Sequence, residues 1–370
     1  MARTRFLSLL CLSFLGGPSS PALAQTGTDP AFRWSAQLYG RSVDDTLSNS
    51  KTVGAAFGLD AEKVFSGALY GHVRGLALLE SGSSSALFTD EFNPNSRLSL
   101  VDARLRWTVF GPLAISAGAL SQEVLQSPVL IDYATFPAAL LSLQWNPDHW
   151  YFEGHAQAAI PTGTGLKTKS TGREDTPELF TETAVLGWRR NPDFFLQGRA
   201  THFDFRALTH GMAQDSRFYG NSVSGVAAAS TFVYRYEGYH LDASGSLPLG
   251  AKFALVAGGS FLRNPNAPAS ANSGRYAYGG FTWAGPGFRL RPIAEWYENQ
   301  ADAGPAFYSS RDFGHNNRRG VGGTLSLQLK EPGLEISVRA RRSDLIDDQP
   351  FQKNNFRYYD LMVGIPYAPF

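Results

Sequence analysis

The sequence predicts an all-β protein, a transmembrane antiparallel β-barrel of about 16 strands, within a range of about 14–18. Three observations support this class: apolar and polar residues alternate, short and long connections alternate, and aromatic residues flank the short connections. Of the 370 residues, 43% are hydrophobic and 18% are charged, and 38 are glycine. Aromatic residues make up 13% of the chain, and this content, with so few charged residues, argues against a disordered chain. The glycine content argues against a helical bundle.

The first 24 residues have the pattern of a cleaved signal peptide. Arg3 and Arg5 precede an apolar stretch over residues 6–15, and Ala22-Leu23-Ala24 matches the small-residue site of a signal peptidase. The stretch is too short for a spanning helix, which needs about 20 residues. We therefore expect residues 1–24 to be removed and residues 25–370 to form a single outer-membrane β-barrel domain. Cys11, the only cysteine, lies in the signal peptide, so the exported part has no disulfide or thiolate metal site.

Most segments between turn residues alternate with period two, as strands with one apolar face do. The clearest apolar series is Val101, Ala103, Leu105, Trp107 and Val109, whose intervening residues are Asp102, Arg104, Arg106 and Thr108. Residues 32–39, 150–158, 288–297 and 321–329 alternate in the same way. Residues 231–247 are expected to form one long strand, because this assignment gives 16 strands and places both termini on one side of the membrane.

The connections between these segments also alternate in length. The tight turns are at 110–112, 146–149, 191–193, 248–250, 285–287 and 331–333, each containing proline or glycine. Long polar stretches separate them, at 80–96, 121–137, 161–177, 206–230, 263–274, 299–317 and 343–355. Short periplasmic turns and long extracellular loops are typical of outer-membrane barrels.

Aromatic residues lie where the strands meet the tight turns, and they share the apolar parity of their strands. They are Trp107, Trp145, Trp150, Trp188, Phe194, Trp283 and Phe288. Such positions predict an aromatic girdle at the periplasmic side of a membrane, because an indole ring prefers the headgroup level.

With these features, the sequence resembles the bacterial outer-membrane porin class along the whole chain after the signal peptide. Its terminal Phe370 is similar to the aromatic residue that such barrels present to the barrel assembly machinery, although Tyr359, Leu361 and Val363 are one residue out of step with it. The resemblance implies a location in the bacterial outer membrane, with lipid and lipopolysaccharide as surroundings. The basic interior is also similar in kind to that of alginate-export-type polysaccharide porins.

If the apolar face contacts lipid, the polar face lines an aqueous pore, since a barrel of this size does not fill its own interior. The predicted pore-lining residues are Arg33, Arg41, Arg74, Arg104, Arg106, Arg199, Arg289, Arg291, Arg339, Arg341, Tyr39, Tyr70, Tyr151 and Tyr297. The inward acids assigned beside them are fewer, namely Asp102, Glu153, Asp242, Glu295, Glu335 and Asp360. Rows of arginine attract anions, and tyrosine rings stack on sugars. Alternatively, each arginine pairs with an acid in the wall, as Arg104 could with Asp102.

Two of the long loops are candidates for narrowing this pore. Residues 121–137 are too apolar for a freely solvated loop, so we expect them to pack against other residues inside the mouth. Residues 206–230 are longer and contain the small residues 226–229. The alternative for either loop is an ordinary extracellular loop that covers the rim.

The function expected from these features is a non-enzymatic channel for hydrophilic solutes, with a bias to anionic or saccharide cargo. The first alternative is a polysaccharide-export porin that works with a periplasmic or inner-membrane export complex. The second is an outer-membrane hydrolase or adhesin. A hydrolase would use His155 with Glu153 or His240 with Asp242, but the sequence has no Gly-x-Ser-x-Gly motif.

Other classes of site and partner receive less support. The histidine spacings match no metal motif, so we predict no metal site and no cofactor. The nearly neutral chain offers no basic patch for nucleic acid. Gly67, Gly71 and Gly75 would form a small-residue outward face on the third strand, which is suited to a homotrimer.

Overall fold

The computed structural model describes residues 30–369 except 46–47, 87–95, 163–173 and 192–193. The predicted signal peptide at residues 1–24 and the terminal Phe370 lie outside the described residues. Within the described part, no helix is both long and apolar enough to cross a membrane.

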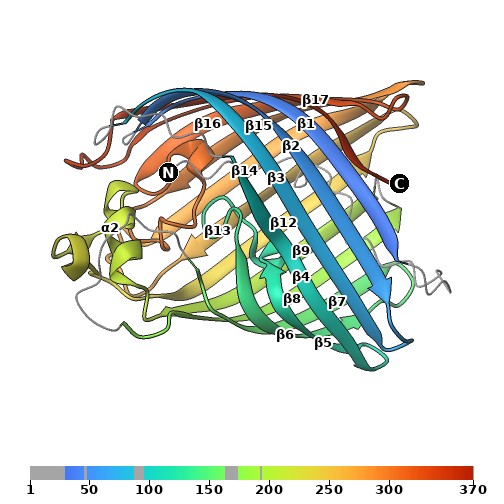
Figure 1. The fold of residues 1–370 in the computed structure, drawn as a ribbon, viewed down its shortest axis with the longest axis horizontal. Helices are drawn as coiled ribbons and strands as arrows, with labels where there is room; N and C mark the ends of the chain where they lie inside the picture. Colours follow the sequence, from blue (N-terminus) through green and yellow to red (C-terminus); the bar gives the residue numbers. More distant parts are fainter. Residues whose placement is uncertain (1–29, 46–47, 87–95, 163–173, 192–193, 370) are drawn as a thin grey trace.

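Sixteen strands form one closed antiparallel barrel, which confirms the predicted fold class (Figure 1). They are β1 (Ala31–Asp44), β2 (Ser48–Val64), β3 (Leu69–Ala86), β4 (Arg97–Phe110), β5 (Leu113–Ser121), β6 (Thr135–Trp145), β7 (Trp150–Ala159), β8 (Glu178–Asn191), β9 (Phe194–Arg206), β12 (Tyr236–Pro248), β13 (Phe253–Arg263), β14 (Ser273–Ala284), β15 (Phe288–Asn299), β16 (Arg318–Leu329), β17 (Glu335–Leu345) and β18 (Asn355–Pro369). Each strand pairs with its neighbours along the chain, and β1 pairs with β18 to close the wall.

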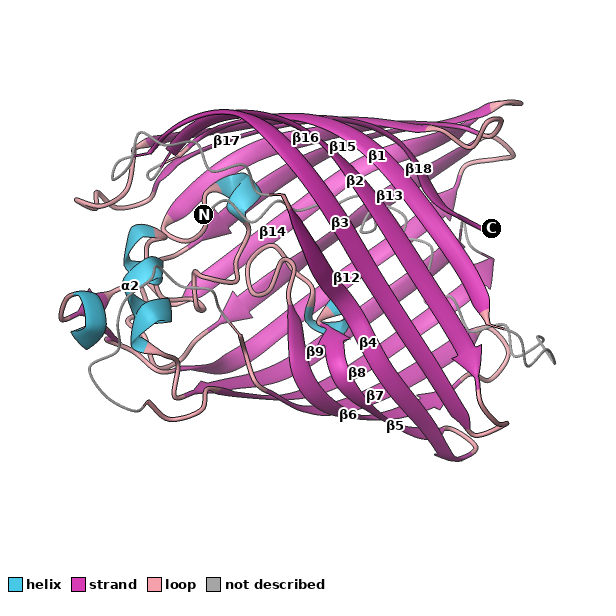
Figure 2. Cartoon of the chain, in the orientation of Figure 1, coloured by secondary structure: helices cyan, strands magenta, loops and turns pink. Residues whose placement is uncertain are grey.

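Both ends of the barrel wall follow the predicted alternation of turns and loops. The tight turns lie at the end of the barrel where β1 begins and β18 ends. Ala31 pairs with Glu62, close to the β2–β3 turn, and Arg33 pairs with Pro369. The opposite end carries the long connections, with α2 (His210–Phe218), η2 (Ala227–Ala229), η3 (Arg311–Phe313) and the small hairpin of β10 (Val223–Ser224) and β11 (Thr231–Phe232). Figure 2 shows α2 at this end of the barrel.

The outer surface of the wall is apolar because one parity of each strand carries large hydrophobic side chains. Exposed members of this set include Leu38, Val53, Phe57, Leu79, Leu105, Leu141, Leu186, Leu196, Leu241, Leu255, Leu325 and Leu361. Trp107, Trp145 and Trp150 are also exposed, next to the tight turns. A closed barrel with an apolar outer band and aromatic residues at one edge is suited to the bacterial outer membrane.

The aromatic residues predicted at the turns also contact one another. Trp188 and Phe194 flank the β8–β9 turn with ring centroids 4.7 Å apart. Trp283 and Phe288 flank the β14–β15 turn at 5.1 Å. Both pairs are edge-to-face, a favourable geometry for aromatic rings.

A β-bulge in β4 corrects one predicted face. Arg74 pairs with Asp102, whereas the next residue, Gly75, pairs with Leu100, so Val101 is an extra residue. A bulge changes the parity of the strand. Leu100 and Leu105 are therefore both exposed to the outside, while Val101, predicted on the apolar outer face, is 4% exposed.

Several strand boundaries also differ from the predicted ones. β3 extends to Ala86, so the predicted loop from residue 80 begins later, and the single strand predicted over 231–247 begins at Tyr236. The first outer connection, between β1 and β2, is short. Gly67 lies in the β2–β3 turn rather than in β3, and the Phe65 ring covers the outer side of Gly71, so the three glycines do not form one open face.

Candidate pore and its internal loops

The β5–β6 connection, residues 122–134, folds into the barrel and contacts strands on several sides of the wall. Glu123 pairs with Arg74 of β3 at 3.3 Å. Arg199 of β9 donates hydrogen bonds to the carbonyls of Val124 and Gln126. Since β3 and β9 are far apart in the strand order, this loop crosses the interior. The prediction that residues 121–137 pack inside the mouth is confirmed.

The apolar part of this loop explains why it does not remain in solvent. Val129, Leu130 and Ile131 are at most 1% exposed and join a hydrophobic cluster inside the barrel. Burying such side chains stabilises their position by roughly 1.5–3 kcal/mol each. The Asn299 side chain donates to the Val129 carbonyl at 3.1 Å, which fixes this part of the loop against β15.

The β15–β16 connection, residues 300–317, forms a second layer beside the first loop. The Asp132 amide donates to the Tyr308 carbonyl at 2.9 Å, and the Ser310 amide donates to the Pro128 carbonyl at 2.8 Å. With the exception of Gln300 and Arg311, the residues of this connection are buried. The two loops therefore pack as one body within the extracellular half of the barrel.

The connection over residues 207–235, which contains α2, covers this body from the extracellular end. Asn221 donates to the Ala301 and Gly304 carbonyls at 2.6 and 3.0 Å. Asp302 accepts from the Ser222 amide at 2.9 Å. Burial raises the pKa of Asp302, although its hydrogen bonds from Ser222 oppose that rise. Residues 206–230 are predicted either to narrow the pore or to cover the rim as an extracellular loop. In the structure this segment covers the internal loops from the extracellular end.

Buried charges connect the loop over 300–317 to the wall. Asp312 pairs with Arg339 at 3.4 Å and with Arg341 at 2.5 Å. Arg341 also pairs with Glu295 of β15 at 2.9 Å, and Arg339 pairs with Asp360 of β18 at 2.6 Å. Each carboxylate thus has a guanidinium partner, which buried charges require.

The predicted pore arginines all lie on the inner face, but they fall into two groups. The first group holds loops or pairs with buried acids, and its members are Arg41, Arg74, Arg199, Arg339 and Arg341, with side chains 2–12% exposed. The second group is more accessible and lies in the half of the barrel near the tight turns; its members are Arg33, Arg104, Arg106, Arg289 and Arg291. Arg33 and Arg104 have side chains 44% and 32% exposed.

The inner face also carries acids that the sequence prediction did not include. Asp60, Glu62 and Glu80 point inward from β2 and β3. The prediction missed Asp60 and Glu62 because it assigned no alternation to β2, and it missed Glu80 because it placed that residue at the start of a long loop. The basic excess of the whole inner face is therefore smaller than expected. The positive charge that a solute can reach comes from the arginines whose side chains stay exposed after they have paired with acids.

Two of the four predicted pore tyrosines cover glycines of the neighbouring strand. Tyr39 lies opposite Gly54, and Tyr151 lies opposite Gly187, with ring atoms 2.4 and 2.0 Å from where a glycine Cβ would be. A larger residue would displace the ring, so each glycine provides the space for its tyrosine. Both tyrosines are 5% exposed.

The other two predicted tyrosines differ in accessibility. Tyr297 is fully buried and stacks on Phe313 of the internal loop, with ring centroids 4.6 Å apart. Tyr70 is half-buried and lies 6.5 Å from the His72 ring. Of the four, Tyr70 is therefore the most accessible to a solute.

The histidine–acid pairs considered for a hydrolase differ from each other. His155 contacts Glu153 at 3.2 Å, as that hypothesis required. His240 does not pair with Asp242, which instead pairs with Arg199 at 3.2 Å. The His240 ring is completely buried and makes no hydrogen bond within the described residues, so it lacks the orienting acid of a triad.

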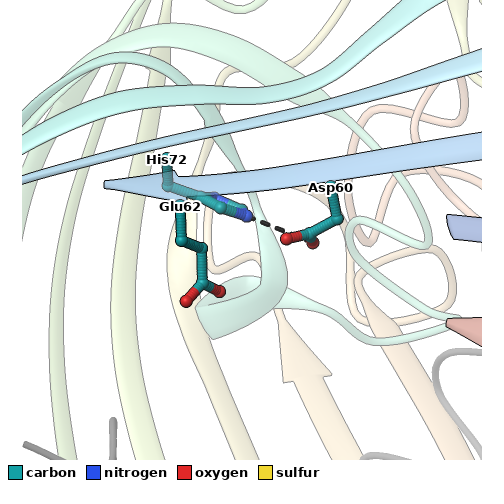
Figure 3. A group of neighbouring side chains, drawn as sticks. All are labelled: Asp60, Glu62 and His72. Atoms are coloured by element: carbon teal, nitrogen blue, oxygen red, sulfur yellow. Dashed lines mark hydrogen bonds and ion pairs between the residues drawn. The ribbon is translucent and has the colours of Figure 1, made fainter. Parts of the chain in front are cut away.

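Asp60, Glu62 and His72 lie close together on β2 and β3 (Figure 3). One potential ligand atom from each falls within 4.8 Å of the others, a geometry that could hold a metal ion. However, Arg33 pairs with both carboxylates, and the two ring nitrogens of His72 contact Asp60 at 3.2 Å and Asp102 at 3.1 Å. Two guanidinium groups already pair with these carboxylates, since Arg74 also contacts Asp60 at 3.4 Å, so the group acts as an ionic connection between β1, β2, β3 and β4.

Known structures with the same architecture cover nearly the whole chain. The high-pH structure of OprB from Pseudomonas putida has a TM-score of 0.56 at 11% identity, over 92% of this chain and 94% of that chain. The chain has the fold of bacterial outer-membrane porins. The low-pH structure of the same porin gives a TM-score of 0.52 at 11% identity, over 91% of both chains.

A third porin-fold neighbour is the loop L8 deletion mutant of OmpT, an outer membrane protein of Vibrio cholerae. It has a TM-score of 0.50 at 10% identity, over 92% of this chain and 99% of that chain. No protein-family profile and no curated protein matches the sequence. The sixteen-stranded barrel has the same architecture as these porins, and its apolar outer band fits the bacterial outer membrane in which they lie.

Proposed function

We propose that this porin-fold barrel is a non-enzymatic channel for small hydrophilic solutes and that it favours anions, including anionic saccharides. The observation that carries the proposal is the group of accessible inward arginines near the tight turns. Arg106 of this group makes its hydrogen bond to the neutral Gln144 side chain at 3.2 Å. Its neighbour Arg104 keeps about a third of its side chain exposed while pairing with Asp102.

These arginines suit anions for two physical reasons. A guanidinium is permanently charged and offers a planar set of donors that matches a carboxylate or phosphate. The internal loops occupy the opposite half of the barrel, so a solute that enters from the turn side meets the arginines first. The saccharide part of the proposal rests on Tyr70, because the other predicted tyrosines are buried.

The test is single-channel recording of the purified protein in planar bilayers, with the permeability ratio of chloride to potassium as the readout. The variant Arg104→Glu/Arg106→Glu reverses two charges on the inner face. The matched control is Arg342→Glu/Arg357→Glu, because these arginines pair directly across β17 and β18 and both are exposed on the outer face.

The change in selectivity follows from the charge that is reversed. At about 10 Å, a unit charge in water contributes roughly 0.4 kcal/mol, and salt at 0.1 M screens it further. Each Arg→Glu substitution changes the charge by two units, so the variant changes it by four. This changes the permeability ratio of chloride to potassium by roughly threefold to tenfold. Anion selectivity that falls in the inner variant and persists in the control supports the proposal. Equal ratios in both variants, or no conductance at all, would contradict it and favour the gated export porin.

A further inference from the structure

The two ends of the first internal loop, residues 122–134, are fixed by one short stretch of β4. At its start, the Ser121 amide donates to the Asp102 carboxylate at 3.2 Å. At its end, the Thr135 hydroxyl donates to the Val101 carbonyl at 2.5 Å. Val101 is the extra residue of the β-bulge, and a bulge turns a neighbouring side chain in a new direction. The carboxylate of Asp102 therefore has a direct part in where the loop leaves the wall.

His72 of β3 lies between Asp102 and a second carboxylate that also leads to this loop. Its Nδ1 atom lies 3.1 Å from Asp102, and its Nε2 atom lies 3.2 Å from Asp60 (Figure 3). The three side chains are at most 6% exposed. Asp60 contacts Arg74 at 3.4 Å, and Arg74 pairs with Glu123 of the loop at 3.3 Å. His72 is thus connected to the start of the loop through each of its ring nitrogens.

The two contacts of the ring need a protonated histidine. A neutral imidazole has one N–H donor and one acceptor nitrogen, whereas a carboxylate only accepts. A neutral His72 would therefore face one of the two carboxylates with a lone pair and would lose that hydrogen bond. Only the imidazolium ion donates to Asp60 and Asp102 at the same time.

The charges around His72 also balance only when the ring is protonated. The carboxylates that face this group from β2, β4 and the loop are Asp60, Glu62, Asp102 and Glu123. The guanidinium groups that pair with them, from β1, β3 and β4, belong to Arg33, Arg74 and Arg104. The Tyr70 ring, 6.5 Å away, is uncharged near neutral pH. Within the described residues, four carboxylates thus meet three guanidinium groups, and His72 supplies the fourth positive charge.

Protons can reach this group from the lumen. The side chains of Arg33 and Glu62, which pair with each other, are 44% and 33% exposed. A histidine side chain ordinarily changes its charge near neutral pH. The charge of His72 can therefore follow the pH of the solution in the pore.

We propose that His72 is a positioning residue that makes the start of the first internal loop, and through it the passage along the pore, respond to pH. As the pH rises, the ring loses a proton, and either Asp102 or Asp60 loses its donor. Loss at Asp102 disturbs the hydrogen bond from Ser121, and loss at Asp60 disturbs the contact of Arg74 with the loop. The effect on passage rests on the proposed channel function, whereas the movement of the loop does not.

The experiment is NMR spectroscopy of the purified protein in detergent micelles, between about pH 5 and pH 9. A chelator in all buffers excludes effects of divalent cations on the carboxylates. The imidazole resonances give the protonation of His72. Hydrogen exchange of two backbone amides, corrected for the intrinsic effect of pH, reports the position of the loop. The Ser121 amide donates to Asp102, and the Gln126 amide donates to the Glu123 carbonyl at 3.2 Å.

We expect the protection of at least one of these two amides to fall by roughly tenfold or more as the ring loses its proton, since a charge-assisted hydrogen bond is lost. The Asp132 amide is the internal reference, because it donates to the Tyr308 carbonyl at the far part of the loop. Its protection should not change with the protonation of His72.

Two variants and one control separate the charge of the ring from its packing. His72→Gln removes the group that titrates, so its amide protection should be independent of pH. His72→Lys keeps a positive charge up to about pH 9 and should keep high protection throughout. The control is His155→Gln, because His155 is also an inward histidine but contacts Glu153 of its own strand at 3.2 Å. It should follow the wild-type profile.

An imidazole that titrates without a change at either amide, or that does not titrate between about pH 5 and pH 9, would overturn the proposal. Equal pH profiles in the wild type and in His72→Gln would also overturn it.

Single-channel recording over the same pH range tests the effect on passage. Fluctuations of the open-pore current should increase as His72 loses its proton in the wild type, and they should not depend on pH in His72→Gln. A current that stays the same while the amides change would overturn the effect on passage. A barrel that does not conduct would contradict the proposed channel alone, because the exchange of the amides needs no current.

Discussion

Arg199 provides the sharpest test of how the first internal loop is held. It donates to two carbonyls of that loop, at Val124 and Gln126, and its side chain is 10% exposed. The variant Arg199→Met keeps most of the side-chain volume and removes both donors. A hydrogen bond from a charged group contributes about 1.5–3 kcal/mol, so the two together contribute about 3 kcal/mol or more.

That energy predicts a measurable local opening. About 3 kcal/mol corresponds to a roughly hundredfold change in an equilibrium constant. Backbone amides over residues 123–126 should then exchange with deuterium roughly a hundred times faster in the variant. The amides of Ser127 and Asp132 should keep their protection, because they bond to the Ile131 and Tyr308 carbonyls and lie beside the buried residues 129–131.

Hydrogen-exchange mass spectrometry of the protein in detergent micelles measures both segments at once. Arg104→Met is the control, because Arg104 is also an inward arginine but pairs with Asp102 of its own strand rather than with the loop. Equal acceleration over 123–126 and 127–132 would show that the loop opens as one unit. No acceleration would refute the assignment of Arg199 as its anchor.

Two further variants test the wall and the second loop, with urea unfolding in detergent as the measurement. Gly187→Ala should lower the free energy of unfolding by about 1–3 kcal/mol, because its Cβ displaces the Tyr151 ring. The control Gly198→Ala should stay within about 0.5 kcal/mol of the wild type, because there is open space around Gly198. Equal effects of the two variants would contradict the pairing of glycine with tyrosine. Asp312→Asn should lower the free energy of unfolding by about 3 kcal/mol, because Arg339 and Arg341 lose a buried partner. The control Asp344→Asn should lower it by only about 0–1 kcal/mol, because its pair with Arg342 is exposed. An Asp312→Asn variant as stable as the wild type would mean that the loop is held without this ion pair.

Much of the architecture could be predicted because contact with lipid requires every second residue of each strand to be apolar. The alternation around Leu105 and Trp107 and the position of the tight turns depend on local sequence alone, and both predicted the barrel and its 16 strands. The bulge at Val101 could not be predicted, since an extra residue in one strand is defined only by its pairing partner.

The interior was less predictable because its charges pair over long distances. Asp312 and Arg339 are 27 residues apart, and Arg199 and Val124 are 75 residues apart. Parity places an arginine on the inner face but does not show whether a loop lies over it. The apolar composition of residues 121–137 did predict an internal loop, because a solvated loop gains nothing from buried valine, leucine and isoleucine.

The contact between β1 and β18 has a consequence for assembly of the protein. It joins residues far apart in the chain: Asp44 at the end of β1 pairs with Lys353, just before β18, and the two are 309 residues apart, so this contact forms late in folding. Asp360 of β18 reaches Arg41 only when these strands meet, and its other partner, Arg339, also contacts Asp312 of the second internal loop. The event that completes the wall therefore also completes the support of the second internal loop. An unfinished barrel would lack both the last seam of its wall and this support of the second internal loop, so closure of the wall and placement of that loop are one step of assembly.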